Sequence, residues 1–383
     1  MGYLTTESVN PVPEWGKSQK AGGNYGTTTI LSEHALEISA NSNSIPVIDV
    51  SNIFSPILEA RKAVAAEIRE ACINVGFFYV QNHGIPQELV DGVFEWGKKF
   101  FDLSFEEKME IYIDNIYHYR GYTPLYGAGT AGSDGKGNAN EAFDWGHDSK
   151  LNDDPEDLFL DPYMRGENPW PKQLPGFEAH LSEYYHTMRA FCRVMARNIA
   201  LSLGLQESHF DSVLTHPGCS ALVAHYPPQE PKSGNLGLSA HTDAECKENF
   251  RSNKRELMPR LLVFTILAAG EVRALEVMRR DGYWISAPPK KDCFIINVGD
   301  QLQAWSNDLY VSTLHRVLNY SGQERYSVPF FFSANYETVI EALMKDGHVA
   351  SHSPLTAGQM YKETMIGFHK IADTIPELVK YRK

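Results

Sequence analysis

The stretch Gly237-Leu238-Ser239-Ala240-His241-Thr242-Asp243 sets the expectations for the rest of the chain. Side chains alternate between the two faces of a strand, so His241 and Asp243 point one way and Thr242 the other. One imidazole and one carboxylate make half of a metal site. His315, which follows a strand-like run at residues 293–298, is the candidate third ligand. Two histidines and one carboxylate form the facial triad that holds Fe(II) and leaves coordination positions open.

A second motif, Arg325-Tyr326-Ser327, follows ten residues after His315. In a strand, Arg325 and Ser327 again share a face. A guanidinium offers two parallel donors that match a carboxylate, and the serine hydroxyl adds a third. His-x-Asp alone is often a surface turn in a chain with 14 histidines. His-x-Asp followed by His and then Arg-x-Ser at this spacing is far more specific, and it predicts a metal triad followed by a carboxylate clamp.

With these motifs the chain resembles the iron- and 2-oxoglutarate-dependent oxygenases, in the branch of isopenicillin N synthase, flavonol synthase and anthocyanidin synthase. The resemblance runs from about residue 45 to about residue 369. Five further stretches carry it: Ile45-Pro46-Val47-Ile48-Asp49, Gly76-Phe77-Phe78-Tyr79-Val80, Asn82-His83-Gly84-Ile85-Pro86, Tyr226-Pro227-Pro228 and Pro329-Phe330-Phe331-Phe332.

The resemblance implies a set of cofactors and ligands. Fe(II) would be bound by His241, Asp243 and His315, with 2-oxoglutarate as co-substrate and O2 at the remaining position. The co-substrate would leave as succinate and CO2 while a small organic molecule of specialised metabolism is hydroxylated, desaturated or cyclised. Three residues would hold the far carboxylate of 2-oxoglutarate: Arg325, Ser327 and Tyr226.

The resemblance also implies substrate contacts. Phe331 lies an even number of residues after Arg325, which places both on one face of a strand, and it matches a family position that packs on the substrate. The stretch 141–146, which includes Phe143, matches a stretch that borders the substrate pocket. Many relatives carry Asn two residues before the tyrosine of Tyr-Pro-Pro, whereas this chain has Ala224, which removes one polar contact to the co-substrate.

The pattern along the chain divides it into regions. Residues 1–44 are rich in Gly, Ser, Thr and Asn and predict a poorly structured tail. Residues 45–205 read as a mostly helical region, with a long loop between 121 and 144. Seven short strand-like runs between 221 and 334 predict a jelly roll within 206–345, followed by a helical segment at 346–383. The fold class is therefore α+β, a double-stranded β-helix core with supporting α-helices in one compact enzyme.

The amino-acid composition argues against some classes of binding partner. The net charge is −13, with 35 basic and 48 acidic residues, which argues against nucleic acids and anionic membranes as partners. The five cysteines are scattered and form no CxxC pair, as expected for reduced thiols in a cytoplasmic protein. No apolar run is long enough to span a membrane. The expected partner is a small-molecule substrate, and nothing indicates an oligomeric state.

One segment departs from the family pattern. Between Cys246 and Phe264 lie 17 residues, 247–263, where relatives continue directly into a strand. Without them the separation of Asp243 and His315 falls from 72 to 55, near the family spacing. Two interpretations stay open: a surface lid beside the metal, or a short intron translated in the gene sequence. We expect the segment to be exposed, basic and dispensable for the fold; burial of Met258, Leu261, Leu262 and Val263 at the pocket mouth would instead indicate a lid.

Two rival functions also stay open. The first is an iron oxidase of the same family that does not use 2-oxoglutarate, since one such relative also carries Arg-x-Ser; succinate formation would distinguish the two. The second is a binding protein on a catalytically dead jelly roll, which the intact triad argues against.

Overall fold

The computed structural model describes residues 45–129, 136–148, 166–229, 237–243, 262–319, 321–343 and 355–382. The predicted tail at 1–44 lies outside them. The helices and strands follow in chain order: β1 (Val47–Asp49), α3 (Leu58–Asn74), β2 (Phe77–Gln81), α4 (Gln87–Phe101), α5 (Phe105–Met109), β3 (Gly121–Thr123), β4 (Glu141–Gly146), α6 (Phe177–Ser202), β5 (Cys219–Tyr226), β6 (Leu238–His241), β7 (Phe264–Ala269), β8 (Leu275–Met278), β9 (Trp284–Ser286), β10 (Cys293–Val298), α7 (Asp300–Trp305), β11 (His315–Val317), β12 (Arg325–Phe332), β13 (Val339–Ile340), β14 (Leu355–Thr356), α8 (Ala357–His369) and α9 (Pro376–Val379).

Two sheets form the centre of the molecule. The larger has the strand order β1-β2-β10-β7-β12-β5-β4-β3 and the smaller β6-β11-β8-β9. Apolar side chains from the facing sides of both sheets pack together, among them Tyr79 and Ile295 of the larger sheet and Val277 and Val317 of the smaller. This is the predicted jelly-roll arrangement. The larger sheet runs across residue 206, because β1 to β4 join strands that come later in the chain.

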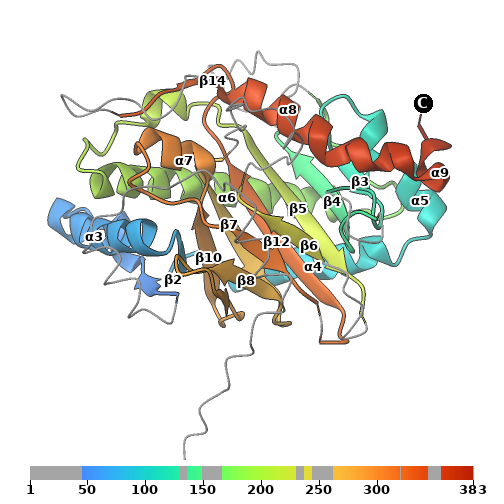
Figure 1. Ribbon diagram of the computed structural model, residues 1–383, viewed down its shortest axis with the longest axis horizontal. Coiled ribbons are helices and arrows are strands. Elements are labelled where there is room, and N and C mark those ends of the chain that lie inside the picture. The colour runs from blue at the N-terminus through green and yellow to red at the C-terminus, as the bar shows by residue number, and fades with distance from the viewer. Residues whose placement is uncertain are drawn as a thin grey trace, which may run out of the picture.

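Helices cover the other face of the larger sheet. The helices α4 and α6 contact β5 and β12, while α3 packs on β1, β2 and α6. Aromatic residues fill the space between, with Phe143 of β4 against Phe100 of α4 and Phe177 of α6. Figure 1 shows α3 at one end of the sheet and α8 and α9 towards the other. The α+β fold class is confirmed, and the larger sheet has a helix-covered outer face and an inner face turned to the smaller sheet.

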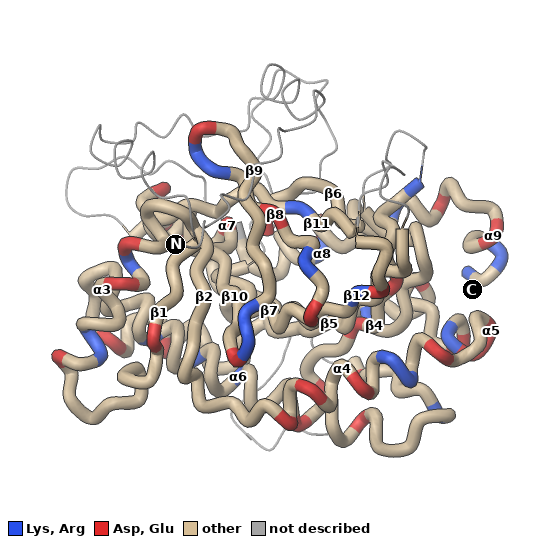
Figure 2. Tube along the Cα trace, turned by 90° about the horizontal axis from the view of Figure 1, so that it is seen from below, with Lys and Arg blue, Asp and Glu red and all other residues tan. Residues whose placement is uncertain are grey.

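Charged residues lie mainly outside the central strands. In Figure 2 the coloured residues lie mainly on helices and turns, whereas the traces of β2 and β10 carry none. No helix among the described residues is long and apolar enough to cross a membrane.

The first long helix, α3, begins at Leu58. Its N-cap Ile57 has no side-chain cap, and the Ser55 hydroxyl accepts a hydrogen bond from the Ile57 backbone N–H before the helix starts. The predicted long loop needs correction. The stretch 121–144 is not a continuous loop, because β3 and the first residues of β4 lie within it. Short strands at a sheet edge carry too few residues for an alternating pattern to stand out.

The unusual segment 247–263 ends inside the fold. Residues 247–261 lie outside the described part of the chain, but Leu262 and Val263 are buried. The Val263 backbone N–H donates to the Phe332 carbonyl, and the Gly299 N–H donates to the Val263 carbonyl. The expectation that the whole segment is exposed is therefore wrong for its last two residues, which extend the start of β7.

These contacts predict different outcomes for two deletions. A variant lacking residues 247–261 keeps the buried pair and should retain the fold and metal binding, because connection length costs only about 0.6 kcal/mol per doubling. A variant lacking residues 247–263 requires Glu245 and Cys246 to take the places of Leu262 and Val263. Thermal unfolding and Fe(II) titration of both variants provide the measurement. Failure of the shorter deletion to fold would show that the segment is needed.

Candidate metal and co-substrate site

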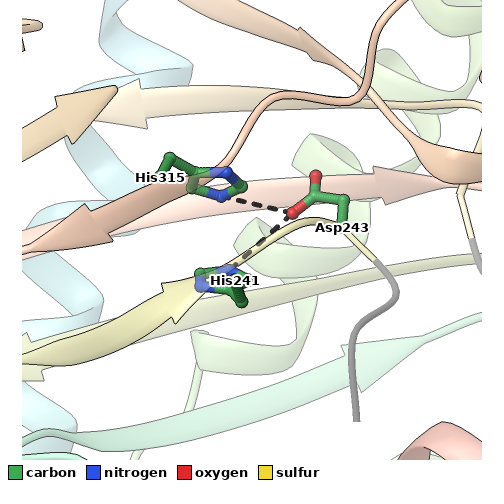
Figure 3. A group of neighbouring side chains, drawn as sticks. All are labelled: His241, Asp243 and His315. Atoms are coloured by element: carbon green, nitrogen blue, oxygen red, sulfur yellow. Dashed lines mark ion pairs between the residues drawn. The ribbon is translucent and has the colours of Figure 1, made fainter. Parts of the chain in front are cut away.

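The two candidate histidines meet where the strands of the smaller sheet pair. His241 is the last residue of β6 and His315 the first of β11, and the two are direct partners in the antiparallel register. Their ring centroids lie 4.2 Å apart. Asp243 follows β6 by two residues, and its carboxylate turns back towards both rings (Figure 3). The structure thus brings together three residues that the sequence separates by up to 74 positions.

The three side chains point their ligand atoms at a common space. Asp243 Oδ1 lies 3.9 Å from His241 Nε2 and 3.3 Å from His315 Nε2. All three ligand atoms lie within 4.8 Å of one another. In each histidine, Nδ1 contacts the backbone carbonyl two residues earlier, Ser239 at 2.7 Å and Thr313 at 3.0 Å. With Nδ1–H as donor, each Nε2 keeps its lone pair for a metal, which is the usual outer support of a histidine ligand.

Asp243 is held by two polar residues of the larger sheet. Thr265 Oγ1 and Asn297 Nδ2 both donate hydrogen bonds to Asp243 Oδ2, which leaves Oδ1 directed at the histidines. Burial alone would raise the pKa of Asp243, but in the metal-free protein the protonated form of the His315 imidazole beside it holds that pKa well below its ordinary value. The carboxylate is therefore ionised and oriented, as a ligand for a divalent metal must be.

The sequence interpretation missed Thr265 and Asn297. Each is a polar residue in an otherwise apolar strand, β7 and β10 respectively. A buried polar group needs a hydrogen-bond partner, so such exceptions are signals of a site. Their cross-strand register, Asn297 opposite Thr265, places both beneath Asp243.

The predicted carboxylate clamp lies on the inner face of β12. Arg325 is 2% exposed, and its register partner on β5 is Tyr226. Its guanidinium carbon lies 4.4 Å from the centre of the Tyr226 ring, a cation–π contact that fixes the plane of the guanidinium. Arg325 Nη1 is buried, and no described residue accepts a hydrogen bond from it. A buried donor without an acceptor is costly, so the site is built for an anionic ligand.

The other predicted site residues lie on two different faces of the larger sheet. Ser327 is buried next to Arg325 on the inner face of β12, opposite Ala224. Phe331 is half-buried on that face, opposite Thr265. Phe143 is fully buried on the outer face, in the core formed with the helices. Phe331 therefore lies on the side of the metal triad, and Phe143 is not brought to the site.

Comparison with known proteins gives the family of the chain. Residues 217–334 match the 2OG-Fe(II) oxygenase superfamily, and residues 45–173 match the domain described as non-haem dioxygenase in morphine synthesis N-terminal. A 2-oxoglutarate-Fe(II) type oxidoreductase, ppzC, of Metarhizium rileyi is 34% identical over 86% of this chain and 87% of its own. A homoarginine-6-hydroxylase of Glycine max is 29% identical over 89% of this chain and 99% of its own. The structure of JOX2 in complex with 2OG, Fe and JA superimposes with a TM-score of 0.67 at 24% identity, covering 89% of this chain and 96% of that one.

The chain belongs to the 2OG-Fe(II) oxygenase superfamily. It is an oxidoreductase that uses Fe(II) and 2-oxoglutarate to oxidise small molecules. The resemblance inferred from the motifs is confirmed.

Proposed function

We propose that His241, Asp243 and His315 hold the catalytic Fe(II). The donor set supports this, because two imidazole nitrogens and one carboxylate oxygen suit Fe(II) and occupy only half of an octahedral shell. The supporting hydrogen bonds fix both imidazoles and the carboxylate before a metal arrives, so binding requires little reorganisation.

The far carboxylate of 2-oxoglutarate binds Arg325 and Ser327, with Tyr226 beneath the guanidinium. The observation that carries this proposal is the buried Arg325 Nη1 without an acceptor among the described residues. A carboxylate placed there would accept the free donor, and the Ser327 hydroxyl on the same face offers another. This arrangement favours 2-oxoglutarate over the iron oxidase alternative.

When bound, iron and 2-oxoglutarate supply the oxidising chemistry, in which O2 is consumed and succinate and CO2 are formed. The protein positions the reactants and excludes water. Arg325 would hold the far carboxylate of the co-substrate, and buried apolar residues such as Ile295 and Val317 pack between the two sheets. We place the substrate among small organic molecules of specialised metabolism; the names of the relatives specify one substrate, homoarginine, for only some of them.

The test is an anaerobic titration of the purified protein with Fe(II) and then 2-oxoglutarate, followed by a substrate screen that measures succinate. One iron per chain and saturable 2-oxoglutarate binding are expected, with succinate formed in step with an oxidised product. Product formation that does not depend on 2-oxoglutarate would assign the chain to the oxidase alternative.

Thr265→Val should weaken metal binding without removing a ligand. Valine has nearly the shape of threonine but cannot donate to Asp243 Oδ2, so one of the two hydrogen bonds that orient the carboxylate is lost. Loss of such a supporting contact typically costs about 10- to 100-fold in metal affinity. Competitive Fe(II) titration measures the affinity, and Thr374→Val, at an exposed position, is the matched control. Unchanged metal affinity would show that Asn297 alone orients Asp243.

A further inference from the structure

The inner face of the larger sheet is only partly covered beside the proposed site. Some inward residues of β5, β7 and β12 keep intermediate exposure, whereas every outward residue of these strands is buried. These half-buried inward residues are Ser220, Leu222, Leu267, Ala269, Pro329 and Phe331. Most are apolar, so this surface suits the hydrocarbon part of a small molecule.

A single acidic side chain interrupts this surface. Asp144 of β4 is paired with Leu222 of β5, and Ala142 with Ala224, so both belong to the face that carries Arg325 and Ser327. Asp144 is half-buried, whereas every other residue of β4 is buried. Alternation along β4 directs Phe143 to the helices and Asp144 to the inside.

The Asp144 carboxyl has no partner in the described part of the chain. Its cross-strand neighbours are Leu222, which is aliphatic, and Gly121, which has no side chain. Burial raises the pKa of Asp144 to about 8, and no opposing charge lowers it. By contrast Glu141, three residues earlier on the outer face, has Lys108, Tyr122 and His225 as partners. The described residues therefore supply partners for the Glu141 carboxylate but none for the Asp144 carboxyl.

We infer that Asp144 binds a cationic group of the substrate, a guanidinium or an ammonium. A buried carboxyl is costly unless it is paired, and a ligand cation would supply the missing charge. On β3, β4, β5, β7 and β12, Arg325 and Asp144 are the only charged side chains on the inner face. This inference rests on the proposed function, in which Arg325 is occupied by 2-oxoglutarate.

The spacing fits a substrate of modest length. Asp144 is level with Pro329 but lies two strands away, about 10 Å at the usual strand spacing. A cation held at Asp144 would lay its aliphatic part across Leu222 and Pro329, towards the metal side of Phe331. Asp144 would therefore decide which molecules are oxidised and which of their carbons faces the iron.

The experiment measures binding of matched cationic and neutral compounds to the anaerobic protein loaded with Fe(II) and 2-oxoglutarate. The probes are L-homoarginine against L-homocitrulline, and L-lysine against its Nε-acetyl derivative. At least one cation should bind about tenfold or more tightly than its neutral partner. Asp144→Asn should bring that ratio close to one, and Asp144→Glu should restore part of it. Asp91→Asn, at an exposed position, is the control.

The outcomes separate this inference from the proposed function. Asp144→Asn should bind iron and 2-oxoglutarate like the parent protein, because Asp144 is none of the proposed ligands and lies two strands from Arg325 and Ser327. If no cation binds more tightly than its neutral partner, or if the preference survives in Asp144→Asn, the inference is wrong while the proposed function stands. The same titrations with cationic and neutral compounds on the metal-free protein measure the cation preference even if the iron assignment is wrong.

Discussion

His315→Ala should abolish stoichiometric Fe(II) binding and all turnover. Removing one imidazole leaves His241 and Asp243, and two ligands do not hold Fe(II) against water and buffer. The loss should be larger than that of any supporting residue, because His315 also faces the Asp243 carboxylate at 3.3 Å. Iron analysis after gel filtration and succinate formation provide the two measurements.

The fold should survive this substitution. Asp243 keeps its hydrogen bonds from Thr265 and Asn297, so its buried carboxylate is not left unsatisfied. The lost ring contact with Phe77, whose centroid lies 5.2 Å from that of His315, lowers stability modestly. His209→Ala removes an exposed imidazole and controls for the general effect of losing a histidine. One iron retained per chain in His315→Ala would overturn the ligand assignment.

The placement of the candidate metal ligands and of the candidate clamp was predictable because strand alternation converts sequence spacing directly into shared faces. His241 and Asp243, and likewise Arg325 and Ser327, are two residues apart. Their pairing across strands was not predictable from spacing alone. The register that sets His315 opposite His241 depends on contacts between segments far apart in the chain.

Near the proposed substrate surface, alternation alone does not predict which residues of a strand face inward. Residues 141–146 alternate clearly, but the pattern does not reveal which set faces inward. The aromatic residues Phe143 and Trp145 face outward because α4 and α6 cover that side with further aromatic rings. Asp144 faces inward as a result. The helices thus determine which residues of β4 face inward, and the position of the helices depends on tertiary packing.

The strand order of the larger sheet could not be predicted from the sequence either. The strands β1 and β2 lie on either side of α3 in the sequence, more than 200 residues before β10, yet they extend the sheet beyond β10. Short apolar runs such as Phe77–Gln81 predict a strand but not its neighbour. Leu262 and Val263 illustrate the same limit, because their burial depends on hydrogen bonds to the Phe332 carbonyl and from the Gly299 and Gln301 N–H groups.

Arg325→Ala should raise the 2-oxoglutarate concentration required for half-maximal turnover by about 10- to 100-fold. A charge-assisted hydrogen-bond pair in a buried site contributes about 1.5–3 kcal/mol, and 1.4 kcal/mol corresponds to a factor of ten. Iron affinity should stay within about twofold, because Arg325 contacts none of the metal ligands and weak indirect effects are small. Direct 2-oxoglutarate titration of the iron-loaded protein separates binding from catalysis.

Arg325→Lys should recover only part of the loss. An ammonium keeps the charge but lacks the two parallel donors, and it cannot stack flat on the Tyr226 ring as the guanidinium does at 4.4 Å. Arg197→Ala removes an arginine whose partner is Asp211 at an exposed position, and it should leave the co-substrate requirement unchanged. If Arg325→Ala also leaves that requirement unchanged, the guanidinium does not bind the co-substrate, and the buried Nη1 serves another ligand.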